Sequence, residues 1–119
     1  MERKRLLVVD DEELLLELFK SLFEAEGFDV ETALDGVQAV TKLKEKRFDL
    51  VLTGIRMPRI SGLELLEYLK ENIPGQKVIV VSGYASARLP ALQLGILEFI
   101  QKPPDTVHLL ASVRRALNV

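Results

Sequence analysis

The chain contains no cysteine among its 119 residues, so disulfide bonds and thiolate metal sites are both excluded. It also lacks an excess of charge of one sign. Its 16 lysines and arginines stand against 18 aspartates and glutamates, which gives a formal net charge of -2. Nucleic acids attract strongly basic surfaces. We therefore expect no direct binding of nucleic acid.

Long hydrophobic runs are missing as well. No apolar run approaches the ~20 residues that a membrane-spanning helix needs, and the N-terminal segment MERKRLLVVDDEE becomes acidic too early for a signal peptide. Hydrophobic residues make up 48% of the chain and charged residues 29%, which is the balance of a folded globular protein. We expect one cytoplasmic domain over residues 1–119, without membrane contact and long enough to bury a core.

What the chain does contain is a regular alternation of short apolar runs and longer amphipathic segments. The apolar runs are too short for helices and predict buried strands, whereas apolar residues at helical spacing predict helices. The expected strands are 6–9, 28–32, 50–53, 78–81 and 97–100. The expected helices are 11–26, 36–46, 62–72, 86–94 and a last helix that Asp105 caps and that ends at Leu117.

This alternation predicts an α/β fold in three layers. Continuous apolar strands indicate a parallel sheet with helices on both faces. In the first helix we expect an inward stripe formed by Leu15, Leu18, Phe19, Leu22 and Phe23. Functional residues of such folds gather at the carboxyl ends of the strands.

Five residues stand at those strand ends. Asp10 and Asp11 follow the first strand, Gly54 the third, Ser82 the fourth and Lys102 the fifth. Carboxylates with free oxygens favour a hard cation such as Mg²⁺. An amine and a hydroxyl suit the oxygens of a phosphoryl group. The residues by themselves therefore predict a pocket for a metal and a phosphate.

Each of these residues alone has a simpler interpretation. An Asp-Asp pair at the start of a helix often only caps it and complements its dipole, and a lysine before a proline is usually solvated. Their joint placement at one edge of one sheet favours the functional interpretation. His108 has no carboxylate or histidine at ligand spacing, so we assign it to the surface.

Four segments together resemble the receiver domain of two-component response regulators, and the resemblance runs from end to end. They are LLVVDDE (6–12), LVLTGIRMPRISGLELLEYLK (50–70), VIVVSGYAS (78–86) and LGILEFIQKP (94–103). The resemblance implies a doubly wound, five-stranded parallel sheet of flavodoxin-like type with the strand order 2-1-3-4-5. It implies a signalling module rather than an enzyme.

The resemblance also implies a magnesium site. Asp11 matches the usual direct ligand, Asp10 matches a ligand that acts partly through water, and Arg56 matches the position whose backbone carbonyl binds the metal. No organic cofactor is implied.

Phosphoryl recognition is carried by three further positions in this resemblance. Ser82 matches the hydroxyl residue that contacts the phosphoryl group, Phe99 matches the aromatic switch residue, and Lys102 matches the lysine that pairs with the phosphoryl oxygens. Lys102-Pro103 matches the family's usual cis peptide. The implied partners are a sensor histidine kinase or a phosphotransfer protein, and the family pattern also allows a homodimer.

Gly54 departs from the family pattern, because it falls where the phospho-accepting aspartate belongs. That carboxylate attacks phosphorus in line and forms an acyl phosphate, and it is also a metal ligand. Glycine does neither, so we expect no phosphorylation at position 54 and weakened binding of Mg²⁺. A second departure is the segment from Ser82 to Lys102, which is slightly shorter than is common and contains Pro90.

Two alternatives remain open. The chain is either a naturally phosphorylation-incompetent module that acts through protein–protein contacts, or an ordinary phosphorelay receiver into which an inactivating glycine was engineered. A flavodoxin-like nucleotide-binding protein is a third interpretation. Against it, the sequence has no glycine-rich loop after the first strand and no nucleophile–base pair.

Overall fold

A computed structural model describes residues 2–119, and strands and helices alternate along all of them. The strands are β1 (Arg5–Val9), β2 (Asp29–Ala33), β3 (Leu50–Thr53), β4 (Val78–Ser82) and β5 (Glu98–Gln101). The helices are α1 (Glu13–Ala25), α2 (Gly36–Glu45), α3 (Gly62–Asn72), the short 3₁₀ helix η1 (Ala85–Ala87), α4 (Arg88–Gln93) and α5 (Thr106–Leu117).

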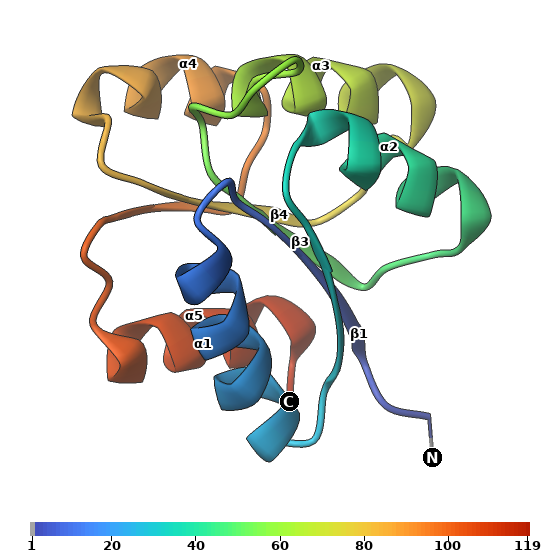
Figure 1. The fold of residues 1–119 in the computed structure, drawn as a ribbon, viewed down its shortest axis with the longest axis vertical. Helices are drawn as coiled ribbons and strands as arrows, with labels where there is room; N and C mark the ends of the chain where they lie inside the picture. The colour runs from blue at the N-terminus through green and yellow to red at the C-terminus, as the bar shows by residue number, and fades with distance from the viewer. Residues whose placement is uncertain (1) are drawn as a thin grey trace.

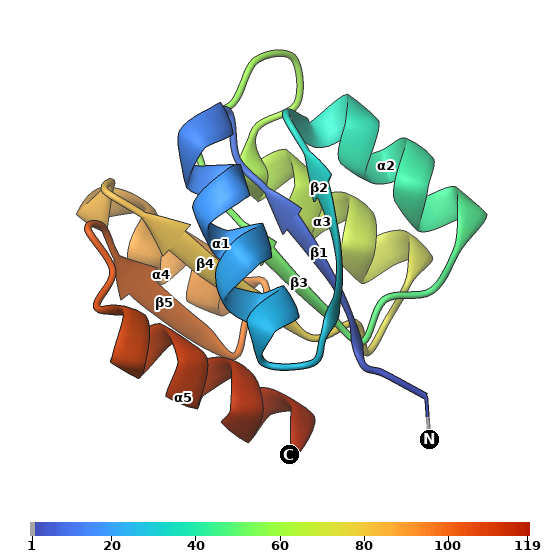
Figure 2. The ribbon, with the colours of Figure 1, turned by 60° about the horizontal axis from the view of Figure 1, so that its bottom comes forward.

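The strands form one sheet in the order β2-β1-β3-β4-β5, and all neighbours pair in parallel. Helices α1 and α5 cover one face of this sheet, and α2, α3 and α4 cover the other (Figure 1). Figure 2 shows the strands running side by side beneath α1. The predicted fold class, a doubly wound parallel sheet of order 2-1-3-4-5, is confirmed.

Two hydrophobic clusters lie on either side of the sheet. Phe19, Phe23 and Leu109 belong to the cluster under α1 and α5, whereas Leu65 and Leu69 belong to the cluster under α2, α3 and α4. Neighbouring residues of one strand enter opposite clusters because side chains alternate along a strand. Every position of a central strand is therefore buried, which explains why these strands read as continuous apolar runs.

Polar side chains define where several helices begin. Asp35 precedes α2 and accepts a hydrogen bond from the backbone N–H of Gln38. Ser61 and Glu64 form a capping box at the start of α3. Asp105 accepts hydrogen bonds from the first turn of α5, and this confirms the predicted cap.

The first helix differs from the prediction in its start and in its buried face. It begins at Glu13 rather than Asp11, because Asp10 accepts a hydrogen bond from the backbone N–H of Glu12 and keeps the chain in a loop there. Leu18 is 53% exposed, so its place in the inward stripe was wrong. Leu16 lies three and seven residues before the buried Phe19 and Phe23, and it occupies the stripe instead.

The segment expected as one helix over 86–94 is divided into the 3₁₀ turn η1 and the six-residue helix α4. Pro90 is the third residue of α4. A proline is tolerated in the first turn of a helix, because its missing N–H has no partner within the helix there. The following strand, β5, begins one residue later than predicted.

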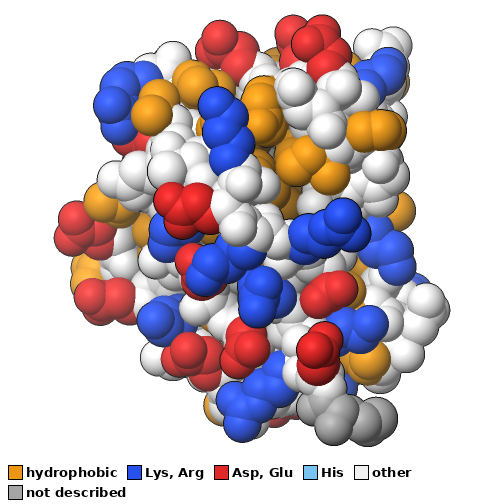
Figure 3. All heavy atoms as spheres, turned by 90° about the vertical axis from the view of Figure 1, so that its right-hand side faces the viewer, with side chains coloured by type: hydrophobic (Ala, Val, Ile, Leu, Met, Phe, Trp, Pro, Cys, Tyr) orange, Lys and Arg blue, Asp and Glu red, His pale blue; other side chains and the backbone are white. Residues whose placement is uncertain are grey.

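On the side of the molecule that α2 covers, the surface carries both charged and hydrophobic side chains. Basic and acidic side chains are interspersed over its lower part, and hydrophobic side chains gather toward its upper part (Figure 3). His108, on α5, is exposed as predicted, although its Nε2 lies 2.9 Å from Oε2 of Glu98 on β5. Within residues 2–119, no helix combines the length and apolar character needed to cross a membrane.

Candidate functional site

The carboxyl ends of β1, β3, β4 and β5 enclose a cleft of about 470 Å³. Parallel strands end at one edge of a sheet, so residues far apart in the sequence meet there. The predicted strand-end residues all line this cleft. Its lining consists of Asp10, Asp11, Glu12, Gly54, Ile55, Arg56, Ser82, Gly83, Tyr84 and Lys102.

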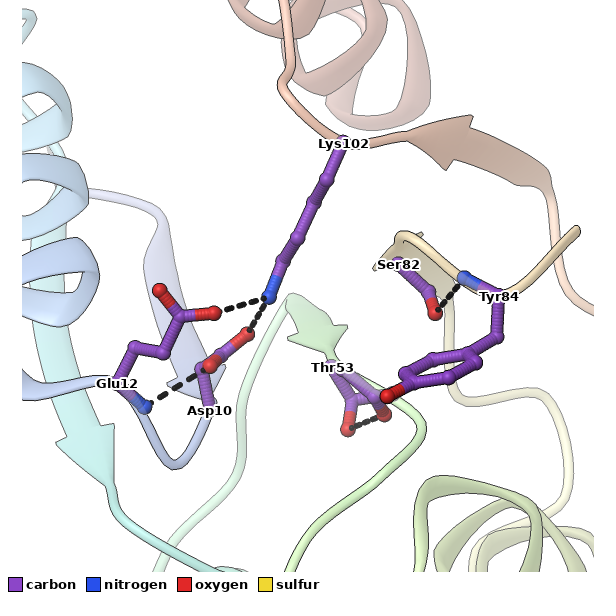
Figure 4. Close-up of polar contacts among 7 residues, drawn as sticks. Asp10, Glu12, Thr53, Ser82, Tyr84 and Lys102 are labelled. Carbon is purple, nitrogen blue, oxygen red and sulfur yellow. Dashed lines mark hydrogen bonds and ion pairs between the residues drawn. The ribbon is translucent and has the colours of Figure 1, made fainter.

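Lys102 occupies the centre of the polar contacts in the cleft (Figure 4). Its Nζ lies 2.8 Å from Oδ2 of Asp10 and 3.3 Å from Oε1 of Glu12. Burial alone would lower the pKa of Lys102, but the hydrogen bonds and negative charges of these two carboxylates outweigh burial, and the pKa is raised above its ordinary value. The lysine is therefore a charged bridge from the end of β5 to the end of β1.

Asp10 is the buried member of an acidic cluster. Its other oxygen, Oδ1, accepts a hydrogen bond of 3.0 Å from the backbone N–H of Glu12. Carboxylate oxygens of Asp10, Asp11 and Glu12 lie within 4.8 Å of one another. Three such oxygens are a donor set that fits a hard cation such as Mg²⁺. The ammonium of Lys102 already contacts two of these carboxylates, those of Asp10 and Glu12.

Gly54 lies directly against the carboxylate of Asp10. Its N–H donates to the carbonyl of Val9 at 2.9 Å, which fixes the end of β3 beside the end of β1. A Cβ atom on residue 54 would stand 2.9 Å from Oδ2 of Asp10. The carboxylate of Asp10 therefore fills the space in which a side chain at position 54 would begin. Thr53 is buried, donates its hydroxyl to the carbonyl of Gly54, and does not line the cleft.

The opposite wall of the cleft comes from β4 and the loop after β3. Ser82 is buried, and its Oγ accepts a hydrogen bond of 3.0 Å from the backbone N–H of Tyr84. The guanidinium of Arg56 donates to the Tyr84 hydroxyl at 2.8 Å and stacks on the ring, 4.7 Å from its centroid. This pair connects the loops that follow β3 and β4.

Sequence reasoning singles out neither Glu12 nor Tyr84. An acidic first turn of a helix already explains Glu12, and the only signal for Tyr84 is its place two residues after Ser82. Phe99 is half-buried on β5, opposite Val80 of β4, and packs against the cluster under α2, α3 and α4. It does not line the cleft.

The loop after β3 is held in place by close backbone packing and by an ion pair. Arg59 adopts a positive φ of 68° and contacts Asp35 at 2.5 Å. Hydrogen bonds from the guanidinium of Arg59 and then from the backbone N–H of Gln38 keep the pKa of Asp35 below its ordinary value. A Cβ on Gly62 would lie 2.0 Å from the carbonyl oxygen of Gly54, so glycine is required there for the loop to pass.

A larger hollow of about 820 Å³ lies at the opposite edge of the sheet, between the end of α2 and the loop after α3. Its charged lining is mainly basic and includes Lys44, Arg47 and Lys77. The acidic cluster, the Ser82 hydroxyl and Lys102 are all at the other edge. We therefore take the smaller cleft as the site, because the convergent chemistry is there rather than in the larger volume.

A parallel α/β sheet whose carboxyl edge gathers an acidic cluster, a hydroxyl and a lysine defines the class of flavodoxin-like signalling domains. Within that class, the model of the response regulator receiver domain family matches residues 6–114. The chain belongs to this family, and it is a receiver domain of the two-component type.

Curated relatives agree with this assignment. The chain is 37% identical over 115 residues to the transcriptional regulatory protein CpxR homolog of Haemophilus influenzae, covering 95% of this chain and 50% of that protein. It is 36% identical over 118 residues to the transcriptional regulatory protein ZraR of Klebsiella oxytoca, covering 98% of this chain and 27% of that protein. The chain thus spans from about a quarter to half the length of these relatives.

Solved structures give the same result. A CheY-like receiver domain protein from Methanospirillum hungatei superposes with a TM-score of 0.94 at 34% identity, covering 98% of this chain and 95% of that one. The response regulator TrrA from Thermotoga maritima, solved in complex with Mg²⁺-BeF, gives a TM-score of 0.89 at 33% identity, with 96% and 99% coverage.

Proposed function

We propose that this receiver domain does not accept a phosphoryl group and acts through protein–protein contacts. The observation that carries the proposal is Gly54, which directly follows β3 and lines the cleft together with Asp10, Ser82 and Lys102. An acyl phosphate forms only when a carboxylate oxygen attacks phosphorus. A glycine at the proposed acceptor position supplies no such oxygen.

The other proposed roles follow the same pattern. Asp11, Asp10 and the backbone carbonyl of Arg56 would hold Mg²⁺, which neutralises phosphoryl charge when it is bound. Because position 54 contributes no ligand, we infer that this binding is weaker than in a receiver with an aspartate there. Ser82 and Lys102 retain the groups that contact phosphoryl oxygens, and Phe99 retains the aromatic ring of the proposed switch position.

We further propose that residues 1–119 form a single module. Its proposed partners, in the cytoplasm, are a sensor histidine kinase, a phosphotransfer protein or a second copy of the chain. The balanced charge, with a formal net charge of -2, supports a role without direct contact to nucleic acid. If Gly54 were instead an engineered substitution in an ordinary phosphorelay receiver, this chain would be equally unable to accept a phosphoryl group at position 54.

The test compares the chain with its Gly54→Asp and Gly54→Ala variants. Each is incubated with Mg²⁺ and acetyl phosphate, and with Mg²⁺ and beryllofluoride, and is followed by intact mass and amide NMR shifts. We expect the Gly54→Asp variant alone to gain the mass of one phosphoryl group and to respond to beryllofluoride. Gly54→Ala controls for the added Cβ without the carboxylate.

One outcome would contradict the proposal, and a second would show that Gly54 is not its sole cause. A parent chain that responds as strongly as the Gly54→Asp variant would show that position 54 does not disable the site. A Gly54→Asp variant that stays silent would show that the loss lies in more than one position, with the short η1–α4 region as the next segment to examine.

A further inference from the structure

The cleft contains a positive charge that belongs to the chain itself. The ammonium of Lys102 lies between Asp10 and Glu12, at 2.8 and 3.3 Å from their carboxylate oxygens. Asp10 has a side chain that is only 4% exposed, and the Lys102 side chain is 22% exposed. A shielded ion pair of this kind is weakened by salt much less than a surface pair.

Both oxygens of Asp10 are engaged by groups of the protein itself. Oδ2 accepts from Lys102 and Oδ1 accepts from the backbone N–H of Glu12. Among residues 2–119, no buried side-chain nitrogen or oxygen lacks a hydrogen-bond partner. The buried carboxylate of Asp10 is therefore hydrogen-bonded on both oxygens without an added ion, as buried polar groups generally are.

Gly54 is the residue that makes this arrangement fit. A Cβ at position 54 would approach Oδ2 of Asp10 to 2.9 Å, which is closer than side chains pack. Any side chain at that position would push the carboxylate away from its present place, and the Lys102 contact would have to change with it. The absence of a side chain at position 54 and the Asp10–Lys102 pair are therefore linked.

We propose that Lys102 is the built-in counter-ion of the acidic cluster, so that its ammonium takes the place of a divalent cation and fixes the ends of β1 and β5 to each other. The inference rests on the proposed function, because it treats the cleft as a receiver site without an acceptor carboxylate. A divalent ion that enters must displace the ammonium from Asp10. The free energy of breaking the contact between Lys102 and Asp10 is therefore subtracted from the binding free energy of the divalent ion.

The test measures Mn²⁺ affinity by calorimetry and by its paramagnetic broadening of amide NMR signals. The proteins are the parent chain, Lys102→Met, Lys102→Arg and Lys70→Met. We expect Lys102→Met to bind Mn²⁺ at least about tenfold more tightly than the parent, because one positive charge has left the cluster. Lys102→Arg keeps the positive charge and should bind Mn²⁺ as weakly as the parent. Lys70→Met removes an exposed lysine of α3 instead, and it should also bind Mn²⁺ as weakly as the parent.

A parent chain that binds Mn²⁺ as tightly as Lys102→Met would overturn the inference. A second measurement uses the parent chain alone, so the test does not depend on the folding of any variant. We expect the side-chain ammonium of Lys102 to give a slowly exchanging ¹⁵N signal that disappears only as Mn²⁺ or Mg²⁺ saturates the site. A freely exchanging ammonium, or one that metal binding leaves unchanged, would also overturn it.

These results separate the inference from the proposed function. Intact mass after treatment with acetyl phosphate reports only whether the parent chain accepts a phosphoryl group. A parent that gains this mass refutes the proposed function, whatever the metal affinities are. Equal Mn²⁺ affinities of the parent and Lys102→Met refute the counter-ion inference and leave the phosphorylation result untouched.

Discussion

At the scale of single residues, the loop after β3 depends on two backbone segments that nearly touch. The N–H of Gly62 donates to the carbonyl of Ile55 at 2.7 Å, and the Cα of Gly62 faces the carbonyl of Gly54. The glycine at position 62 is thus a requirement of close approach. It keeps the first turn of α3 against the end of β3, and so it holds the floor of the cleft.

We predict that Gly62→Ala destabilises the protein by roughly 1–3 kcal/mol, because the new Cβ would overlap backbone atoms that cannot move freely. Gly83→Ala is the matched control, since a Cβ at Gly83 meets no atom within 4 Å. Urea unfolding of both variants checks this. An unchanged midpoint for Gly62→Ala would show that the loop can shift at little cost.

A second residue-scale prediction concerns the ion pair of Asp35 and Arg59. The pKa of Asp35 is lowered in the folded protein, mainly by Arg59 and then by the N–H of Gln38. A lowered folded pKa means that the stabilisation is present above the unfolded pKa of the carboxyl, and is lost as the pH falls through the folded pKa. We expect Arg59→Met to raise the pKa of Asp35 toward its ordinary value.

Carbon-detected NMR titration of the Asp35 carboxyl group in both proteins measures this shift. Arg88→Met serves as the control, because Arg88 is an exposed arginine on α4 and has no ion pair among residues 2–119. An Asp35 pKa that stays the same in Arg59→Met would assign the shift to the helix cap alone.

How far the site could be predicted from the sequence also depends on single residues. Asp10, Gly54, Ser82 and Lys102 were expected to meet because each stands at or just after the end of a predicted strand, and parallel strands end at one edge. The pairing of Lys102 with Glu12 was not expected. It joins residues that are 90 positions apart, and it depends on side-chain directions that no periodicity encodes.

At the scale of elements, the sequence predicted the existence of helices and strands better than their ends. The start of α1 was misplaced because Asp10 bonds the N–H of Glu12, and this contact keeps Asp11 and Glu12 out of the helix. The run from Leu14 to Leu16 is wholly apolar, so hydrophobicity alone does not say which of its residues face inward. Only the packing against Phe19 and Phe23 selects Leu16.

The helix α4 is the least anchored of the α-helices. It has six residues, of which only Ala91 is buried, and no side chain caps its start. By contrast, α3 has a capping box and four buried residues. Short helices with few buried contacts open locally at low free energy. The η1–α4 segment, which follows the cleft residues Ser82, Gly83 and Tyr84 in the chain, is therefore expected to be the most dynamic helical segment of the domain.

We predict that the amide proton of Leu92 in α4 exchanges with solvent at least about tenfold faster than that of Leu69 in α3, after correction for intrinsic rates. Native-state hydrogen exchange by NMR measures both in one sample. The amide of Val113, a buried residue of α5, supplies a second reference from the other face of the sheet. Equal protection of Leu92 and Leu69 would show that α4 opens only with the whole domain.

At the scale of the whole molecule, one sheet separates two hydrophobic clusters that share its strands. Leu7 and Val9 face the cluster under α2, α3 and α4, whereas Leu6 and Val8 face the cluster under α1 and α5. Each central strand contributes side chains to both clusters. Unfolding that exposes one cluster therefore also removes packing from the other. The site at the sheet's edge therefore rests on a single cooperative unit rather than on two independent layers.

We predict that Leu65→Ala destabilises the protein by about 2–5 kcal/mol, since the Leu65 side chain is fully buried and its removal leaves a cavity. The loss should appear equally in the slowest-exchanging amides of α3, on the same side of the sheet, and of α5, on the other side. Leu18→Ala is the control, because Leu18 is exposed on α1 and should change stability by no more than about 0.5 kcal/mol. If Leu65→Ala lowered protection in α3 but left α5 unchanged, the two layers would unfold separately, and loops on opposite sides of the cleft would not belong to one cooperative structure.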